Sequence, residues 1–132
     1  MEKWRDDRYS TSCIAGGADG EGSVYQIASG WGKVIRKLDK NGKQLWKNSD
    51  GHAAYVMKAH NGALYIGEGW SEVHAVDAET GQKIWSQKLG RTGAYPMQID
   101  AVDDRLEVTV LEPYHTKESK VVNLDPKTGD LI

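Results

Sequence analysis

The sequence lacks the features of a disulfide-bonded protein and of a membrane protein. Its 132 residues include no Phe, three Pro and one cysteine, Cys13. A single cysteine forms neither an internal disulfide nor a thiolate metal site, so cysteine content does not indicate the redox compartment. The apolar runs are only a few residues long, whereas a membrane helix needs about 20 apolar residues. We therefore expect no membrane span.

Charge of one sign is also lacking. The chain has 17 basic and 19 acidic residues, a net charge of −2, and no run of Lys or Arg that would follow a phosphate backbone. A nucleic-acid partner is therefore not expected. Residues 1–7 contain no apolar segment of the kind found in signal peptides, so the compartment stays open between a chain without its signal sequence and a cytoplasmic protein.

What the sequence does contain is an internal repeat, together with 15 Gly. The repeated segments are Leu38–Trp46, Val76–Trp85 and Leu124–Ile132. Repeats of this length are single supersecondary units, and each must stack on its neighbours to bury its apolar faces.

Each repeated segment has the pattern of a β-hairpin. A short aliphatic strand ends at an Asp, which can accept hydrogen bonds from turn amides, and a Gly then supplies the positive φ of a tight turn. The outgoing strand carries a Trp, which we expect to pack between adjacent units. The residues of this structural motif are Asp39, Gly42 and Trp46, then Asp77, Gly81 and Trp85, and finally Asp125 and Gly129.

Two further strands precede each hairpin. In the middle repeat they are residues 53–59 and 63–67, separated by a turn, and the other repeats match them at 9–15 with 24–27 and at 95–102 with 106–111. The sequence therefore predicts an all-β fold, a β-propeller of four-stranded antiparallel blades. We expect one propeller segment over residues 1–132, with blade repeats at 8–47, 48–87 and 88–132. Residues 1–7, with Trp4, read as an orphan outer strand.

The segment Ala75–Trp85 resembles the blade signature of pyrroloquinoline-quinone-like (PQQ-like) propellers, A-x-D-x-x-T-G-x-x-x-W. The copies at 39–46 and 125–132 match it in part. The resemblance implies a periplasmic or extracellular propeller. Quinoprotein dehydrogenases of this fold hold a calcium-bound quinone, and many have a vicinal cysteine pair that this chain lacks. Because the signature implies blade docking and not a cofactor site, we expect no cofactor.

No constellation in the sequence predicts catalysis or a metal site. No Ser-His-Asp order with a nucleophile elbow is present. The segments at Asp19 and Asp39 lack the full set of oxygen ligands that Ca²⁺ requires, so we interpret Asp39 as a turn residue. The histidines show no metal-ligand spacing and are interpreted as surface or turn residues: His52, His60, His74 and His115.

Aromatic residues recur at two places in the repeats. One set falls at the turn between the second and third strands (Trp31, Trp70 and Tyr114), and the other at the start of the first strand (Tyr9, Tyr55 and Tyr95). In a four-stranded meander these places share one face of the disc, where aromatics can stack on sugars or peptides. The alternative is structural, with tyrosines packed between blades and tryptophans covering hairpins. Both readings stay open.

The leading functional hypothesis is a non-catalytic module that binds a glycan or a peptide through this aromatic rim. The alternatives are a protein-assembly scaffold similar to the outer-membrane assembly lipoprotein, and a fragment of a larger quinoprotein-like enzyme. Three blades are too few for a ring of four to eight. We therefore expect self-association into a six-bladed homodimer, with Trp4 of one chain placed after Ile132 of the other. The overlap with residues 130–132, which themselves begin an outer strand, weighs against this closure.

Overall fold

The chain has an all-β fold, as the sequence predicts. The computed structural model describes residues 11–16, 24–28, 34–48, 54–68, 71–89, 95–111 and 119–132, which form eleven strands. None of these residues belongs to a helix long and apolar enough to span a membrane.

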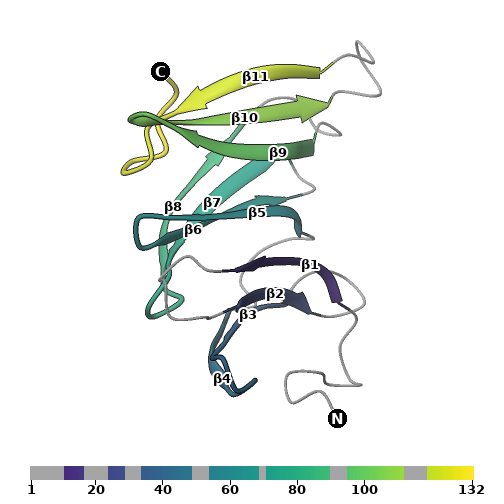
Figure 1. Cartoon of the computed structure of the whole chain (residues 1–132). Coiled ribbons are helices and arrows are strands. Elements are labelled where there is room, and N and C mark those ends of the chain that lie inside the picture. Colours follow the sequence, from purple (N-terminus) through teal and green to yellow (C-terminus); the bar gives the residue numbers. More distant parts are fainter. Residues whose placement is uncertain are drawn as a thin grey trace.

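Three antiparallel sheets follow one another along the chain, each connected as a meander (Figure 1). The first contains β1 (Thr11–Gly16), β2 (Val24–Ala28), β3 (Val34–Leu38) and β4 (Gln44–Asn48). The second contains β5 (Ala54–His60), β6 (Ala63–Glu68), β7 (Glu72–Asp77) and β8 (Lys83–Lys88). The third contains β9 (Tyr95–Val102), β10 (Arg105–Leu111) and β11 (Ser119–Leu124).

The third sheet carries the beginning of a fourth strand at the end of the chain. Leu131 forms a single antiparallel bridge with Leu124, and the Ile132 amide donates to the Asn123 carbonyl at 3.0 Å. This is the start of an outer strand that the sequence predicts at residues 130–132.

Burial differs between the strands according to their place in the sheet. Every residue of β6 is buried because this middle strand has another sheet on each face. On β4 and β8 only the Trp is buried, as expected for strands at the outer edge. On β10 buried and half-buried residues alternate, the period-2 pattern of a strand with one covered face.

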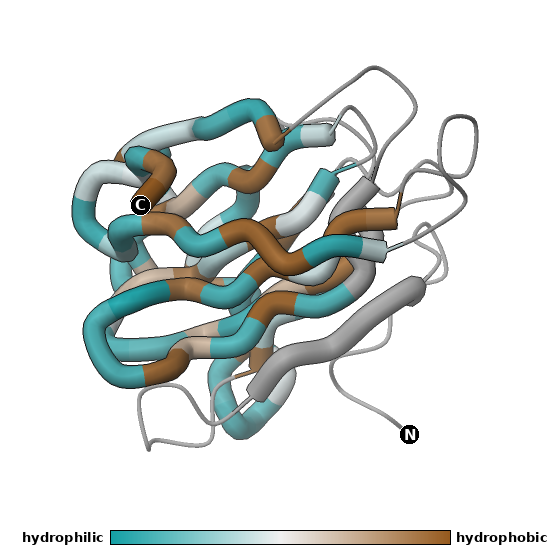
Figure 2. The backbone as a smooth tube through the Cα atoms, turned by 90° about the horizontal axis from the view of Figure 1, so that it is seen from above, coloured by the Kyte–Doolittle hydropathy of each residue, from teal (hydrophilic) through white to brown (hydrophobic). Residues whose placement is uncertain are grey.

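The cores lie between the sheets, which stack face to face. One apolar cluster joins the first and second sheets around Tyr25, Trp46 and Leu64, and another joins the second and third around Tyr65, Trp85 and Val108. The first strands β1, β5 and β9 lie next to one another (Figure 1). Figure 2 shows the hydrophobic positions concentrated along the strands inside the stack. This is the arrangement of consecutive propeller blades.

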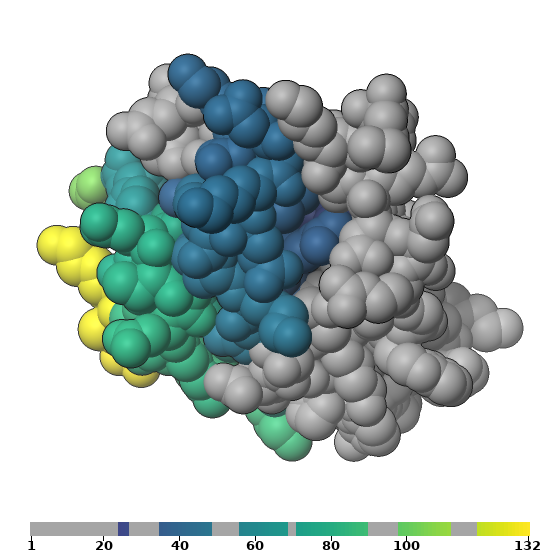
Figure 3. All heavy atoms as spheres, turned by 90° about the horizontal axis from the view of Figure 1, so that it is seen from below, coloured from purple at the N-terminus to yellow at the C-terminus, as the bar shows by residue number. Residues whose placement is uncertain are grey.

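A tryptophan on the outer strand docks each sheet onto the next. The Trp46 indole Nε1–H donates to the Ala78 carbonyl at 3.0 Å, and its ring lies against Gly81. Trp85 repeats the contact, with a 2.9 Å hydrogen bond to the carbonyl of Pro126 and its ring against Gly129. Seen from below, residues 34–48 (blue) lie directly along the second sheet (Figure 3).

The turn aspartates organise the hairpins that receive these tryptophans. The Asp77 Oδ1 accepts hydrogen bonds from the amides of Glu79 and Thr80, at 2.8 and 3.2 Å. Asp39 does the same for the amides of Asn41 and Lys43, at 2.8 and 2.9 Å. Gly42, Gly81 and Gly129 have φ of 84°, 78° and 79°. The local chemistry predicted for these turns is therefore present.

The outward face of the third sheet carries both polar and apolar side chains. On this face Arg105 donates to Glu107 at 2.9 Å and to Asn123 at 3.1 Å. Val121 and Ile132 are exposed beside this network, at 57% and 70%. The equivalent face of the second sheet is made of Tyr65, Val73 and Ala75 and is fully buried. The third sheet thus ends the described stack with a mixed surface.

Gly81→Ala and Gly62→Ala form a matched pair that tests the docking contact. Both glycines have positive φ, 78° and 80°, so an alanine at either place costs about 1–2 kcal/mol of backbone strain. A Cβ on Gly81 would lie 2.6 Å from the Trp46 ring, whereas a Cβ on Gly62 meets nothing within 4 Å. We expect Gly81→Ala to lose about 1–3 kcal/mol more than Gly62→Ala in urea unfolding. Equal losses would show that Trp46 does not depend on this glycine.

The lowered pKa of Asp39 predicts that the free energy of unfolding depends on pH in the acid range. Hydrogen bonding to the Lys43 amide is the main reason that the pKa of Asp39 lies below its ordinary 3.8, and burial opposes this shift. Since the folded pKa is the lower one, the stabilisation is complete above about pH 3.8 and is lost as the pH falls through the folded value. We expect the stability difference between the parent and Asp39→Asn to shrink below that pH, because the asparagine does not titrate. Parallel pH profiles of urea unfolding would contradict this.

Candidate functional site

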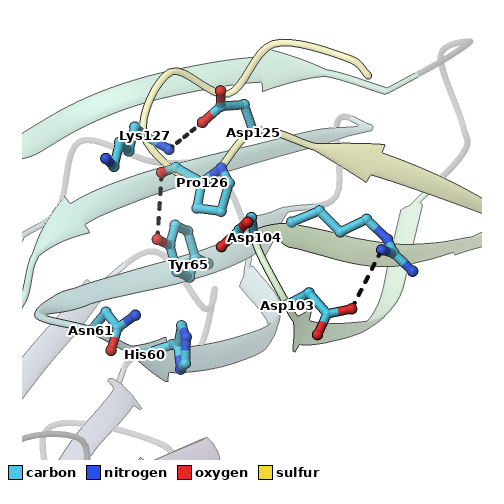
Figure 4. A pocket seen from close by; sticks show the side chains of 9 residues that line it. His60, Asn61, Tyr65, Asp103, Asp104, Asp125, Pro126 and Lys127 are labelled. Carbon is cyan, nitrogen blue, oxygen red and sulfur yellow. Dashed lines mark hydrogen bonds and ion pairs between the residues drawn. The ribbon is translucent and has the colours of Figure 1, made fainter.

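A pocket of about 500 Å³ opens between the second and third sheets (Figure 4). Three turns and one strand contribute to it. The lining residues are His60 and Asn61 of the β5–β6 hairpin, Tyr65 of β6, Asp103, Asp104 and Arg105 of the β9–β10 hairpin, and Asp125, Pro126 and Lys127 after β11. A pocket of this volume is large enough for a small ligand or a few residues of a peptide.

The two hairpins present their polar residues on tight turns. Asn61 and Gly62 have φ of 48° and 80° between the paired residues His60 and Ala63. Two consecutive positive φ values are those of a type I′ turn, for which Asn-Gly is the preferred pair. Asp103, with φ of 53°, makes the corresponding bend in the third sheet. The polar side chains are therefore held by backbone geometry and not by a long loop.

The wall of the pocket is part of the docking contact. The Tyr65 hydroxyl donates to the Pro126 carbonyl at 3.4 Å, and that carbonyl also accepts the shorter hydrogen bond from Trp85. The two rings lie 5.9 Å apart. Burial, and secondarily the negative charge of Asp125, raise the pKa of Tyr65 above its ordinary 10.0. The hydroxyl therefore stays a hydrogen-bond donor at neutral pH.

Several polar groups of the pocket are available to a ligand. Arg105 is engaged by Glu107 and Asn123 and lies 4.0 Å from Asp103. The side chains of His60, Asn61 and Asp104, by contrast, have no hydrogen-bond or ion-pair partner among the described residues. Among the described residues the lining includes no Ser, Thr or Cys, and its polar groups are carboxylates, an amine, a guanidinium, an imidazole, an amide and a phenol hydroxyl. These groups can bind a ligand through hydrogen bonds and ion pairs.

None of the aromatic residues predicted to form a binding rim is among the described residues that line this pocket. Trp31, Trp70, Tyr114 and Tyr9, as well as Trp4, lie outside the described residues. Tyr55 and Tyr95 fall in β5 and β9, where the structure describes the backbone. The pocket opens at the end of the second and third sheets where the β5–β6 and β9–β10 turns lie, which is opposite to the starts of β5 and β9.

The interpretation of His74 as a surface or turn residue is wrong. His74 is neither a surface nor a turn residue: it lies in β7, is 5% exposed and contacts the buried carboxylate of Glu68. Of the others, His60 is at a hairpin as expected, and His52 and His115 lie outside the described residues. The repeat contains a sequence signal that singles out His74. The residue three places before each turn aspartate is Arg36, His74 or Val122, so this strand position differs between repeats while the Asp and Gly of the turn do not.

Solved structures confirm the propeller architecture. A quinohemoprotein alcohol dehydrogenase, ADHIIG from Pseudomonas putida HK5, matches 84% of this chain with 20% identity and a TM-score of 0.71. A europium-containing methanol dehydrogenase matches 100% of it with 17% identity and a TM-score of 0.70. The WD40 β-propeller domain of Doa1 matches 97% with 13% identity and a TM-score of 0.71. At these identities the likeness shows the fold alone.

The matched part is less than half of each of these three proteins. The chain spans 18% and 28% of the two dehydrogenases and 41% of the Doa1 chain. No curated protein sequence matches it significantly.

The family comparison covers most of the chain. The family described as outer membrane protein assembly factor BamB matches residues 32–132, which include all three copies of the Asp–Gly hairpin. Both the repeats and the stacked four-stranded sheets agree with this match. The chain belongs to this family of PQQ-like β-propeller repeat proteins.

Proposed function

We propose that the chain is a non-catalytic binding module of a β-propeller, and that the pocket between its second and third sheets takes a basic peptide segment of a partner protein. The observation that carries the proposal is the convergence of His60, Asn61 and Asp104 beside the Tyr65 hydroxyl. These groups come from two different sheets, and the first three have no side-chain partner among the described residues. A pocket of this kind provides hydrogen-bond donors together with a carboxylate acceptor.

Charge favours a basic ligand. The pocket is lined by three aspartates against one Arg and one Lys, and the Arg105 guanidinium is already engaged by Glu107. A Lys or Arg side chain of a peptide would form an ion pair with the Asp104 carboxylate and donate a hydrogen bond to the amide oxygen of Asn61. The name of the matched family, an outer membrane protein assembly factor, supports a protein as the partner.

The proposal predicts charge-selective peptide binding. We expect labelled peptides rich in Lys and Arg, but not Glu-rich peptides of equal length, to bind in fluorescence anisotropy. Asp104→Asn removes the carboxylate and should weaken that binding about ten-fold, the loss typical of one charge-assisted hydrogen bond. Glu79→Gln makes the same charge change in an exposed turn of the second sheet and should leave the affinity unchanged.

Three results would overturn the peptide proposal. Equal weakening by Asp104→Asn and Glu79→Gln would mean that only net charge matters. Absence of binding to either peptide class would remove the ligand. Binding of a neutral glycan that is lost in Trp70→Ala and kept in Asp104→Asn would favour the aromatic rim of Trp31, Trp70 and Tyr114 as the binding surface instead.

A fragment of a larger quinoprotein-like enzyme is a second candidate, and the similarity to the two dehydrogenases supports it. In this reading other blades would supply the vicinal cysteine pair, because the chain contains only Cys13. The residues described here would then serve as scaffold.

Self-association into a six-bladed ring is a further part of the proposal. The mixed outward face of the third sheet, with exposed Val121 and Ile132, supports an additional packing partner. We expect the mass in solution to be that of a dimer, and deletion of residues 1–7 to abolish both the dimer and the fold. A folded, monomeric deletion variant in analytical ultracentrifugation would refute this closure.

A further inference from the structure

A cluster of ionisable residues lies between the first and second sheets, away from the pocket. Glu68 ends β6, His74 lies in β7, and their side chains are in contact and almost fully buried, 1% and 7% exposed. Glu72, half-buried, stands directly opposite Glu68 in the strand register. Each of the three offers one ligand atom, and these atoms lie within 4.8 Å of one another.

The register places all three side chains on the sheet face that packs on the first sheet. Glu68 is two residues beyond Ile66 on β6, and His74 is the cross-strand partner of Ile66. Ile66 belongs to the apolar cluster shared with Tyr25 and Trp46 of the first sheet. Because side chains alternate along a strand, Glu68, Glu72 and His74 share the face of Ile66.

The fold itself does not require ionisable residues here. In the third sheet Val122 stands three residues before the turn aspartate Asp125, as His74 stands before Asp77. The third-sheet counterpart of Glu68 is Val110, paired with Lys120 as Glu68 is paired with Glu72. Two valines thus fill the positions that Glu68 and His74 occupy. Burying charged groups costs desolvation free energy that an apolar pair avoids.

A cation bound by the three residues would offset the desolvation free energy of their burial. Two carboxylates directly opposite each other across a strand pair repel. One imidazole nitrogen with two carboxylate oxygens is a ligand set suited to zinc and related cations. We propose that Glu68, Glu72 and His74 bind a divalent transition-metal cation, with Zn²⁺ as the representative ion.

The proposed site would be structural in its effect. Zinc ligands at about 2.0–2.2 Å from the ion sit roughly 3.4 Å apart in a tetrahedron, so the three side chains must rotate to close around it. The cation would lie between His74 and Glu68, whose side chains are in contact. The partly exposed Glu72 provides access from solvent and leaves a fourth position for water. Bound metal would join the ends of β6 and β7 where they face the first sheet.

The test uses zinc alone with the untagged chain. We expect one Zn²⁺ per chain in equilibrium dialysis, and at a free zinc concentration one hundred times Kd a folded-to-unfolded ratio about a hundred-fold higher in urea unfolding. Glu68→Val with His74→Val copies the third sheet, so this variant should fold without metal and show neither effect. Co²⁺ should give the parent, and not the variant, visible d–d absorption.

A histidine-depleted variant separates this site from adventitious binding. The chain has four histidines, and replacing His52, His60 and His115 by Gln leaves only His74. Retention of one zinc per chain in that variant would support the site. Absence of a zinc effect in the parent, its persistence in the double valine variant, or its loss on histidine depletion would each overturn the proposal.

Discussion

The contact between an outer-strand tryptophan and the turn of the following sheet is the interaction on which the rest of the structure depends. At the first interface the Ala78 carbonyl accepts from both Trp46 and the Lys37 ammonium, the latter at 2.9 Å, while the ring covers Gly81. Gly81 is required for two reasons, its positive φ and the absence of a Cβ. The contact therefore links the conformation of one hairpin to the packing of its neighbour.

The same contact builds the pocket at the second interface. Trp85 and Tyr65 donate to the single carbonyl of Pro126, which fixes the turn after β11 against the second sheet. The hairpins bearing His60 and Asp104 then project on either side of a floor that is already hydrogen-bonded. Blade docking therefore fixes the floor of the pocket and the backbone of its hairpins before a ligand binds.

The sequence predicts features that depend on residues close together in the chain. The hairpins are predictable because Asp77 and Gly81 lie within one turn, and the predicted strand at 63–67 differs from β6 by one residue. The pocket is not predictable, because its lining extends from His60 to Lys127 and the stacking of sheets brings these turns together. His74 was misassigned because ligand spacing was sought along the chain, whereas Glu68 reaches it across a strand pair.

Comparison of equivalent positions in the repeats distinguishes residues that the fold requires from residues specific to one sheet. The Asp and Gly positions are the same in all three repeats and the Trp position in the first two, but the position three residues before the aspartate holds Arg36, His74 or Val122. Since the third sheet has a valine at that position, packing alone does not require a polar residue there. The second sheet shows this most clearly. One end of its face toward the third sheet carries the pocket, and the opposite end of its face toward the first carries Glu68 and His74. The pocket lies beside the docking contact of Trp85 with Pro126, whereas Glu68 lies at the end of β6 remote from the turn that receives Trp46, so the two polar groups occupy separate parts of the second sheet.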